Sequence, residues 1–116
     1  MSDRPTIAYK VLTAEQMRDL EADRFRGAPI DLADGYIHLS TTQQLTETVD
    51  KHFAGQSGLY VAAIDLEALG NTVKWEESRG GELFPHIYGA MPLAAVLAYR
   101  ALERDEGGTV RPPVAG

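Results

Sequence analysis

The stretch "ADGYIHLSTTQQL", residues 33–45, joins two predicted elements, because a glycine turn leads into a strand pattern and then at once into a helix pattern. The strand is predicted over "YIHLS", residues 36–40. Alternation along a strand places Tyr36, His38 and Ser40 on one face and the apolar residues between them on the other. This polar face, just before a helix begins, is the first candidate for a binding site.

A helix is predicted directly after this strand, over "TTQQLTETVDKHFAG", residues 41–55. Apolar residues recur at steps of four, which is typical of a helix with one buried face. These residues are Leu45, Val49 and Phe53. Ser40 and Gln43 have the spacing of a capping box, so the helix is predicted to begin after Ser40. The free amides of such a helix start favour a phosphate or carboxylate group nearby.

The remaining elements are predicted from the same two periodicities. Strands are predicted at residues 6–12, 59–66, 72–77 and 96–102, an earlier helix at 13–23, and loops at 26–35 and 78–86. The strand at 59–66 is predicted to be central, since it is almost entirely apolar. The order predicts one α+β domain over residues 1–116, with a core at about 6–104, a tail at 105–116, two helices early in the chain and a split mixed or antiparallel sheet.

The composition limits the classes of function that are open to the chain. It has 116 residues, a net charge of −6 with neutral histidines, and no cysteine. The lack of cysteine excludes a disulfide framework, a thiolate zinc site and a cysteine nucleophile. The acidic charge argues against non-specific nucleic-acid binding, and no apolar stretch approaches the roughly 20 residues that span a membrane. We expect a soluble, cytoplasmic protein, monomeric or weakly dimeric, with no membrane partner.

A second candidate region is "VKWEESRGGELFPHIYG", residues 73–89. His86 and Tyr88 are two residues apart and share a face, while Pro85 and the glycines restrict the shape of the surrounding loop. Such a loop forms either one wall of a ligand pocket or a rigid turn with a capping histidine, and the pattern leaves both interpretations open.

Three more side chains in this region have chemistry that suits a site. Trp75 could stack on an aromatic ring, Glu76 could act as acid, base or ribose ligand, and Arg79 could hold a phosphate. Trp75 and Glu76 point to opposite faces of the predicted strand, so only one can line a given pocket. Each residue also has a structural explanation: a core tryptophan, a solvated carboxylate and a surface ion pair.

Common catalytic and metal-binding motifs are absent from the sequence. It contains no GxSxG, P-loop, GxGxxG or HExxH pattern. The spacings between His38, His52 and His86 match no metal motif, so no metal site is predicted. His52 lies on the predicted helix beside Val49 and Phe53 and is interpreted as a packed or edge residue that needs one hydrogen-bond partner.

The chain resembles a bacterial family called domain of unknown function 952. The resemblance extends from about residue 7 to residue 102, and its two most specific blocks are "DLADGYIHLST" and "WEESRGGELFPHIYG". It implies an ADP-ribosyltransferase-like fold, a split α+β arrangement with a central cleft. The tripeptide "HLS", residues 38–40, is similar to the His-any-Thr or His-any-Ser motif with which that superfamily binds the ribose and nicotinamide of NAD.

The resemblance also implies roles for the candidate residues in a cleft lined by His38, Ser40, His86 and Tyr88. The implied catalytic residues are His38, His86 and Glu76. The implied substrate-binding residues are Ser40, Thr41, Trp75, Arg79 and Tyr88. NAD or another nucleotide is the implied ligand. The sequence departs from the superfamily pattern, because it has neither an Arg-Ser-Glu pattern nor the catalytic Glu of the ADP-ribosylating toxins.

Three functions therefore follow from the sequence. The first is an ADP-ribosyltransferase-like enzyme that handles NAD or a nucleotide. The second is a module that binds a small molecule or nucleotide without turnover. The third is a structural or interaction domain in which the histidines serve packing. Convergence of His38, His86 and one polar partner in one cleft distinguishes the first two from the third.

Overall fold

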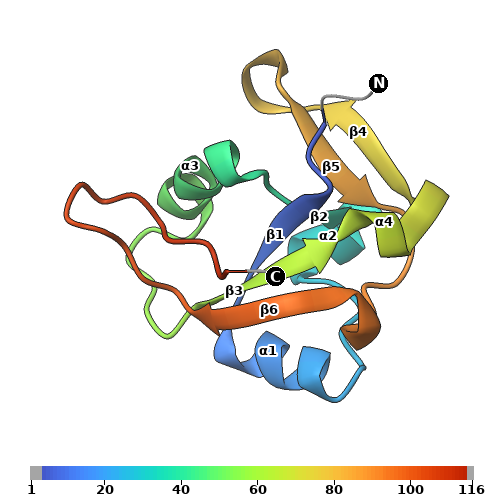
Figure 1. Ribbon diagram of the computed structural model, residues 1–116, viewed down its shortest axis with the longest axis horizontal. Coiled ribbons are helices and arrows are strands. Elements are labelled where there is room, and N and C mark those ends of the chain that lie inside the picture. The colour runs from blue at the N-terminus through green and yellow to red at the C-terminus, as the bar shows by residue number, and fades with distance from the viewer. Residues whose placement is uncertain (1–3, 115–116) are drawn as a thin grey trace.

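The computed structural model describes residues 4–114 and contains two three-stranded sheets (Figure 1). Sheet A has the order β1-β3-β6 and sheet B the order β2-β5-β4, and every pairing between these strands is antiparallel. The strands are β1 (Ile7–Leu12), β2 (Ile37–His38), β3 (Tyr60–Asp65), β4 (Val73–Glu77), β5 (Leu83–Ile87) and β6 (Val96–Ala101). The predicted α+β class and the antiparallel option are thus confirmed.

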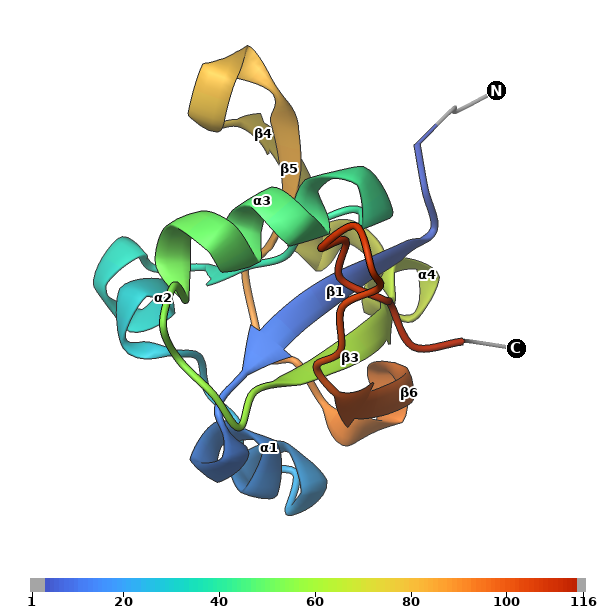
Figure 2. The same ribbon diagram turned by 90° about the vertical axis from the view of Figure 1, so that its left-hand side faces the viewer.

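Helices connect and cover these strands. They are α1 (Ala14–Glu21), α2 (Pro29–Asp34), α3 (Thr42–His52) and α4 (Leu66–Leu69), with 3-10 turns η1 (Gly70–Thr72), η2 (Arg79–Gly81) and η3 (Leu93–Ala95). Within residues 4–114, no helix is long and apolar enough to cross a lipid bilayer. The β4–β5 hairpin projects away from sheet A, and η2 forms its tip (Figures 1 and 2).

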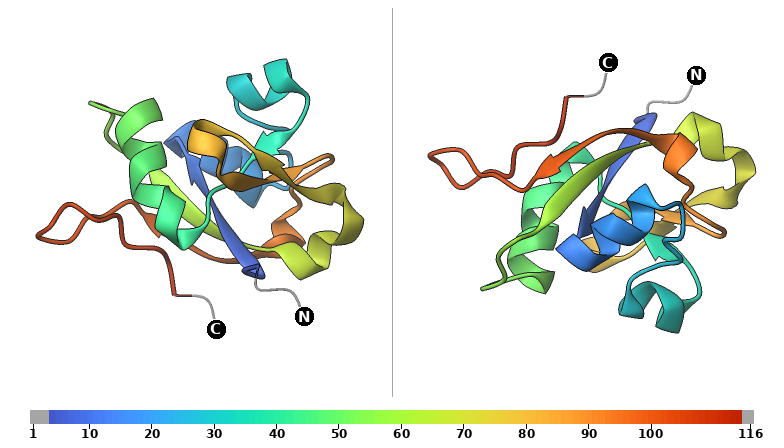
Figure 3. Two further views of the ribbon diagram at one scale, coloured as in Figure 1. Left: turned by 90° about the horizontal axis from the view of Figure 1, so that it is seen from above. Right: turned by 90° about the horizontal axis from the view of Figure 1, so that it is seen from below.

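Sheet A has a buried cluster on each face, because residues along a strand alternate between the two sides. One cluster joins sheet A to α3, which lies across it (Figure 2), and includes Tyr9, Leu45 and Val61. The C-terminal segment runs beside α3 (Figure 3) and adds Val110 to this cluster. As predicted, β3 is central, and four consecutive residues, 61–64, are fully buried.

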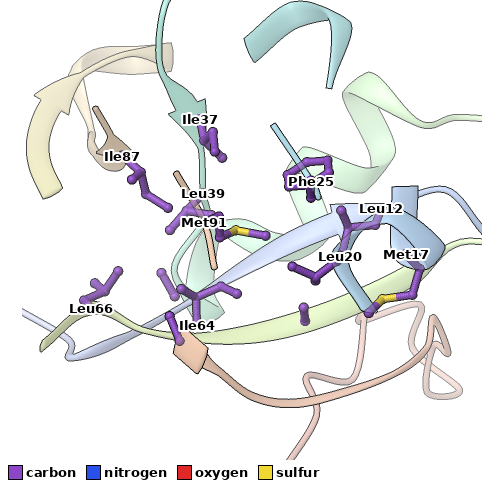
Figure 4. Close-up of a cluster of buried hydrophobic side chains, with 13 residues drawn as sticks. Leu12, Met17, Leu20, Phe25, Ile37, Leu39, Ile64, Leu66, Ile87 and Met91 are labelled. Atoms are coloured by element: carbon purple, nitrogen blue, oxygen red, sulfur yellow. The ribbon is translucent and has the colours of Figure 1, made fainter. Parts of the chain in front are cut away.

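The second cluster fills the space between sheet A, α1 and the inner face of sheet B. It contains Leu12 and Ile64 from sheet A, Leu20 from α1, and Ile37 and Ile87 from sheet B (Figure 4). Burying each side chain of this size contributes roughly 1.5–3 kcal/mol. An isolated backbone bridge between Tyr9 and Ser40 also links the sheets, with hydrogen bonds of 2.8 and 2.9 Å. Sheet B is therefore fixed on one face, and its other face is available for polar side chains.

The prediction of a loop at residues 26–35 is wrong, because this segment contains α2. Pro29 occupies the first turn, Asp31 accepts a hydrogen bond from the backbone N–H of Ala28 at 2.7 Å, and Gly35 ends the helix with a φ of 87°. A proline near the start and a glycine after the end are helix boundary signals. The same two residues are also typical of loops, and the short helix has no buried apolar stripe to distinguish it, since Leu32 is 64% exposed.

The prediction of a loop at residues 78–86 is also wrong in its second half. Residues 83–87 form β5, the middle strand of sheet B, although it contains Pro85. Proline cannot donate to a strand ladder and usually lies at edges. Here β2 pairs only with His86 and Ile87, and the Pro85 carbonyl still accepts a hydrogen bond from the backbone N–H of Leu39 at 3.1 Å.

Two boundaries in the opening stretch differ by a residue or more from the prediction. The strand predicted over 36–40 is limited to Ile37 and His38. The capping box of α3 is formed by Thr41 and Gln44 rather than by Ser40 and Gln43. Both pairs fit the same spacing rule, and Ser40 is instead used in the bridge to β1.

Candidate functional site

The outer face of sheet B gathers aromatic and titratable side chains from its three strands. His38 of β2 is directly opposite His86 of β5, which is directly opposite Lys74 of β4. Directly paired residues in antiparallel strands point to the same side of the sheet. We call the group formed by Tyr36, His38, Glu76, His86 and Tyr88 the His–Tyr face.

The rings of the His–Tyr face are in mutual contact. The ring centroids of His38 and His86 are 5.2 Å apart. Tyr36 stacks on His86 at 4.3 Å and also contacts the rings of His38 at 4.7 Å and Tyr88 at 5.1 Å. His86 is buried, with 3% of its surface exposed, whereas Tyr88 is 40% exposed. The face is therefore an aromatic surface that solvent reaches on the Tyr88 side.

His38 is held by two carboxylates from α2. Its Nδ1 atom is 2.6 Å from Oδ1 of Asp31, and its Nε2 atom is 3.0 Å from Oδ2 of Asp34. The backbone N–H of His38 also donates to Oδ1 of Asp31 at 3.1 Å. The short helix α2 packs beside β2 (Figure 1), which explains how both carboxylates reach one imidazole.

Asp31 is a buried junction between both sheets and α2. Its Oδ2 atom forms an ion pair with Nζ of Lys10 at 2.8 Å, and Lys10 also donates to the backbone carbonyl of His38 at 3.0 Å. Only 2% of Asp31 and 6% of Lys10 are exposed. Burial alone would raise the pKa of Asp31, but hydrogen bonds from His38 and the charge of Lys10 outweigh it and lower this pKa to about 2.

For Lys10, unlike Asp31, the effect of burial on the pKa outweighs the effect of the ion pair. Burial lowers the pKa of Lys10, and the charge of Asp31 opposes that shift. The pair thus places one positive and one negative charge beneath His38, where neither is in contact with bulk water.

The second histidine has its own carboxylate, from the neighbouring strand. Nδ1 of His86 is 2.7 Å from Oε1 of Glu76, and the Tyr88 hydroxyl donates to both oxygens of Glu76 at 2.8 and 3.1 Å. The hydrogen bonds from His86 and Tyr88 lower the pKa of Glu76. The hydrogen bond to Glu76 raises the pKa of Tyr88 to about 12, since ionised Tyr88 could no longer donate to the carboxylate.

Lys74 and Tyr36 also take part in the electrostatic interactions of the face. Nζ of Lys74 lies 4.9 Å from the ring centroid of Tyr88, which is within the range of a cation–π contact. Burial, together with the negative charges of Asp34 and Glu76, raises the pKa of Tyr36. The surface therefore carries two carboxylates and one ammonium group around the aromatic rings.

Four of the residues singled out in the sequence converge on this face: His38, Glu76, His86 and Tyr88. The prediction that the side chains of Trp75 and Glu76 point to opposite faces of their strand is also confirmed. Trp75 packs against the core on the inner side of sheet B, where Arg4 lies 5.5 Å from its ring centroid.

The other predicted site residues have different surroundings. Ser40 is buried and its hydroxyl lies 2.8 Å from that of Thr48 on α3. Thr41 accepts from the backbone N–H of Gln44 at the helix cap. Arg79 lies in the η2 turn at the tip of the β4–β5 hairpin, and its side chain is not among those the structure describes.

Sequence reasoning missed Lys10, Asp31 and Asp34. Lys10 carries a usable signal, because it shares a strand face with the buried residues Ala8 and Leu12, where a lysine needs a charged partner. The two aspartates were hidden by the loop prediction for residues 26–35. In the described part of the chain, no group of three His, Asp or Glu side chains is arranged to hold a metal ion.

Comparisons with known proteins identify relatives of this chain. Residues 11–99 match the family described as "Protein of unknown function (DUF952)". The crystal structure of protein CC0527 from Caulobacter crescentus is similar, with 41% identity and a TM-score of 0.82 over 91% of this chain and 94% of that one. Its solution structure shows 42% identity and a TM-score of 0.76 over 91% of each chain. No curated protein matches. The chain belongs to the DUF952 family.

Proposed function

We propose that the His–Tyr face binds NAD or a related nucleotide and that the protein is an ADP-ribosyltransferase-like enzyme. One observation carries the proposal: His38 and His86 lie 5.2 Å apart on one face, and each has its Nδ1 atom fixed by a carboxylate. Orientation of an imidazole by a carboxylate is typical of catalytic histidines. Packing alone does not require two such pairs in contact on one face of a sheet.

The aromatic side chains suit a flat ring such as nicotinamide. Tyr88 is 40% exposed and contacts Tyr36, so a ligand ring can stack on this pair from the solvent side. His38 and Glu76 lie on either side of His86 and offer a donor and an acceptor to ribose hydroxyls. The arrangement therefore matches the two chemically different parts of a nicotinamide riboside.

The proposed reaction transfers ADP-ribose to a hydroxyl acceptor or to water. The bond between ribose C1′ and the nicotinamide nitrogen breaks, and its electron pair stays on the nitrogen, so that neutral nicotinamide leaves. The carboxylate of Glu76 stabilises the positive charge that develops on the ribose. The acceptor oxygen then bonds to C1′, and its proton passes to His86.

The remaining predicted residues take supporting roles in this proposal. Ser40 and Thr41 hold the start of α3 beneath the end of β2. Trp75 supports Glu76 from the inner side of sheet B. Arg79, at the tip of the hairpin, and Lys74, on the face itself, supply positive charge for the phosphates of the ligand. A cytoplasmic location and a monomeric or weakly dimeric state belong to the same proposal.

A second candidate, a binding module without turnover, is favoured by one contact. Both oxygens of Glu76 accept hydrogen bonds from Tyr88, and one also pairs with His86. A carboxylate engaged in this way stabilises a ribose cation only if Tyr88 moves aside. If Tyr88 stays in place, the same surface binds the ligand without cleaving it.

Binding is tested by titrating the protein with NAD, ADP-ribose and nicotinamide and following the midpoint of thermal unfolding. We expect saturable stabilisation by at least one of them. Tyr36→Leu should weaken binding at least about tenfold, or about 1.4 kcal/mol, because it removes the ring that contacts both histidines. Tyr99→Leu is the control, since it makes the same change on β6, away from the His–Tyr face.

Turnover is tested by incubating the protein with NAD and measuring released nicotinamide. Release that Glu76→Gln abolishes, with Glu21→Gln unaffected, supports the enzyme. Saturable binding with no nicotinamide released supports the binding module. Absence of binding by all three compounds contradicts both proposals and leaves the packing interpretation.

A further inference from the structure

The imidazole of His38 lies between two carboxylates, one at each ring nitrogen. Nδ1 is 2.6 Å from Asp31 and Nε2 is 3.0 Å from Asp34. A carboxylate can only accept hydrogen bonds, and a neutral imidazole has only one N–H. Both contacts are therefore hydrogen bonds only when the ring carries a proton on each nitrogen.

The charges around His38 also favour the doubly protonated ring. The ammonium group of Lys10 from β1 is paired with Asp31, so these two buried charges cancel. Asp34 from α2 then leaves one uncompensated negative charge beside Nε2. The other facing groups are the phenol ring of Tyr36 at 4.7 Å and the ring of His86 at 5.2 Å. An imidazolium at His38 brings the summed charge of Lys10, Asp31, Asp34 and His38 to zero. The contact of His38 with the Tyr36 ring then becomes a cation–π contact.

His86 differs from His38 in its number of carboxylates. Glu76 is the hydrogen-bond partner of the His86 ring within residues 4–114, and it lies at Nδ1. None of the buried side-chain nitrogen or oxygen atoms described lacks a hydrogen-bond partner, and 4% of the His86 side chain is exposed. A neutral ring with its proton on Nδ1 satisfies this environment and leaves a lone pair on Nε2.

We propose that Asp31 and Asp34 hold His38 as an imidazolium, so that His38 is the charged hydrogen-bond donor of the site and the neutral His86 is its base. The division of roles rests on the proposed function, whereas the charge of His38 does not. Asp31 is a positioning residue, because it is buried and acts through His38. Asp34 is about half exposed and is the partner that a ligand displaces.

This assignment specifies the ligand group that meets His38. Once Asp34 is displaced, the Nε2–H of His38 needs another acceptor, such as a carbonyl or phosphate oxygen. A ligand that presents only a donor at this position would leave the charged N–H of the half-buried His38 without an acceptor, which is costly. The ligand therefore places an acceptor oxygen at His38, while the acceptor hydroxyl or water that loses its proton lies at His86.

The experiment is an NMR measurement of the ring nitrogens in ¹⁵N-labelled protein without ligand. It is made about one pH unit above the ordinary histidine pKa of roughly 6.5. His38 should show two protonated ring nitrogens, and His86 should show a neutral ring with the proton on Nδ1. Signals are assigned with His52→Gln and His86→Gln, which leave the buried Lys10–Asp31 pair intact.

The Asp34→Asn variant gives the decisive comparison. It removes one carboxylate at the surface, and we expect His38 to lose the proton on Nε2 under the same conditions. Asp19→Asn removes an exposed carboxylate on α1 and should leave His38 unchanged. A neutral His38 in the unmodified protein, or an Asp34→Asn spectrum identical to it, overturns the proposal. Because no ligand is present, this failure is distinct from a failure to bind NAD.

Discussion

The imidazole rings of His38 and His86 are 5.2 Å apart on the outer face of sheet B, although they are 48 positions apart in the chain. The pairing of β2 with β5 sets this distance, and separate carboxylates from α2 and β4 set the orientation of each ring. The inner face of the same strands is part of the core. The stability of the core thus fixes the geometry of the His–Tyr face.

Replacing Asp31 by Asn should destabilise the protein strongly at neutral pH. The change leaves the buried Lys10 without its ion-pair partner, and breaking one side of a buried pair typically costs about 3–5 kcal/mol. Urea unfolding measures the loss. Asp50→Asn breaks the exposed pair with Arg104 and should cost less than about 1 kcal/mol. Equal losses in the two variants would show that the buried junction is not important for stability.

Asp31 should also make the stability depend on pH in the acid range. Its pKa is lowered from 3.8 to about 2 in the folded protein. The ionised form is therefore favoured by folding, so its contribution is complete above about pH 4 and is lost as the pH falls through 2. The lowered pKa corresponds to about 2 kcal/mol. The difference in unfolding free energy between Asp31→Asn and the unmodified protein should narrow by this amount on acidification, and a constant difference would contradict the prediction.

The contact between Glu76 and Tyr88 can be tested separately by titrating the tyrosines. The pKa of Tyr88 is raised to about 12 by its hydrogen bond to Glu76. In Glu76→Gln the negative charge is gone, so the Tyr88 pKa should fall towards 10. Ultraviolet absorbance of the tyrosinate form measures this, with Tyr88→Phe to assign the signal. Glu77→Gln, one residue away and exposed, is the control; an unchanged titration in Glu76→Gln would refute the contact.

Gly35 should tolerate no side chain without a cost in stability. It ends α2 with a φ of 87°, and no atom lies within 4 Å of the position where a Cβ would be added. The cost of Gly35→Ala is therefore one of backbone conformation, about 1 kcal/mol. Gly89→Ala, where φ is not positive and the nearest atom is at 3.6 Å, should cost less. The unfolding free energies of both variants test this difference.

Much of the His–Tyr face could be predicted because strand periodicity is a local property. The alternation around His38, and the opposition of Trp75 and Glu76, follow from the two-residue repeat alone. The same repeat placed Ser40 with His38, but the chain leaves β2 after His38 to bridge Tyr9 of β1. That departure depends on a partner 31 residues earlier in the sequence, which no local pattern shows.

The junction at Asp31 could not be predicted for a related reason. Asp31 contacts Lys10 and His38, which lie on two different sheets. The short helix α2 that carries it has exposed apolar residues, so the usual periodicity of a buried helix face is missing. Similarly, Pro85 predicted a loop, whereas pairing with β2 and β4 makes the surrounding residues a strand.

Binding of a nucleotide at the His–Tyr face can be tested by a single titration. The imidazole carbon-bound proton signals of His38 and His86 are followed by NMR while NAD is added. We predict that both signals shift together and saturate at the same NAD concentration, while the signal of His52, on α3, stays in place. Unchanged His38 and His86 signals throughout the titration, or changes confined to His52, would rule out nucleotide binding at this face.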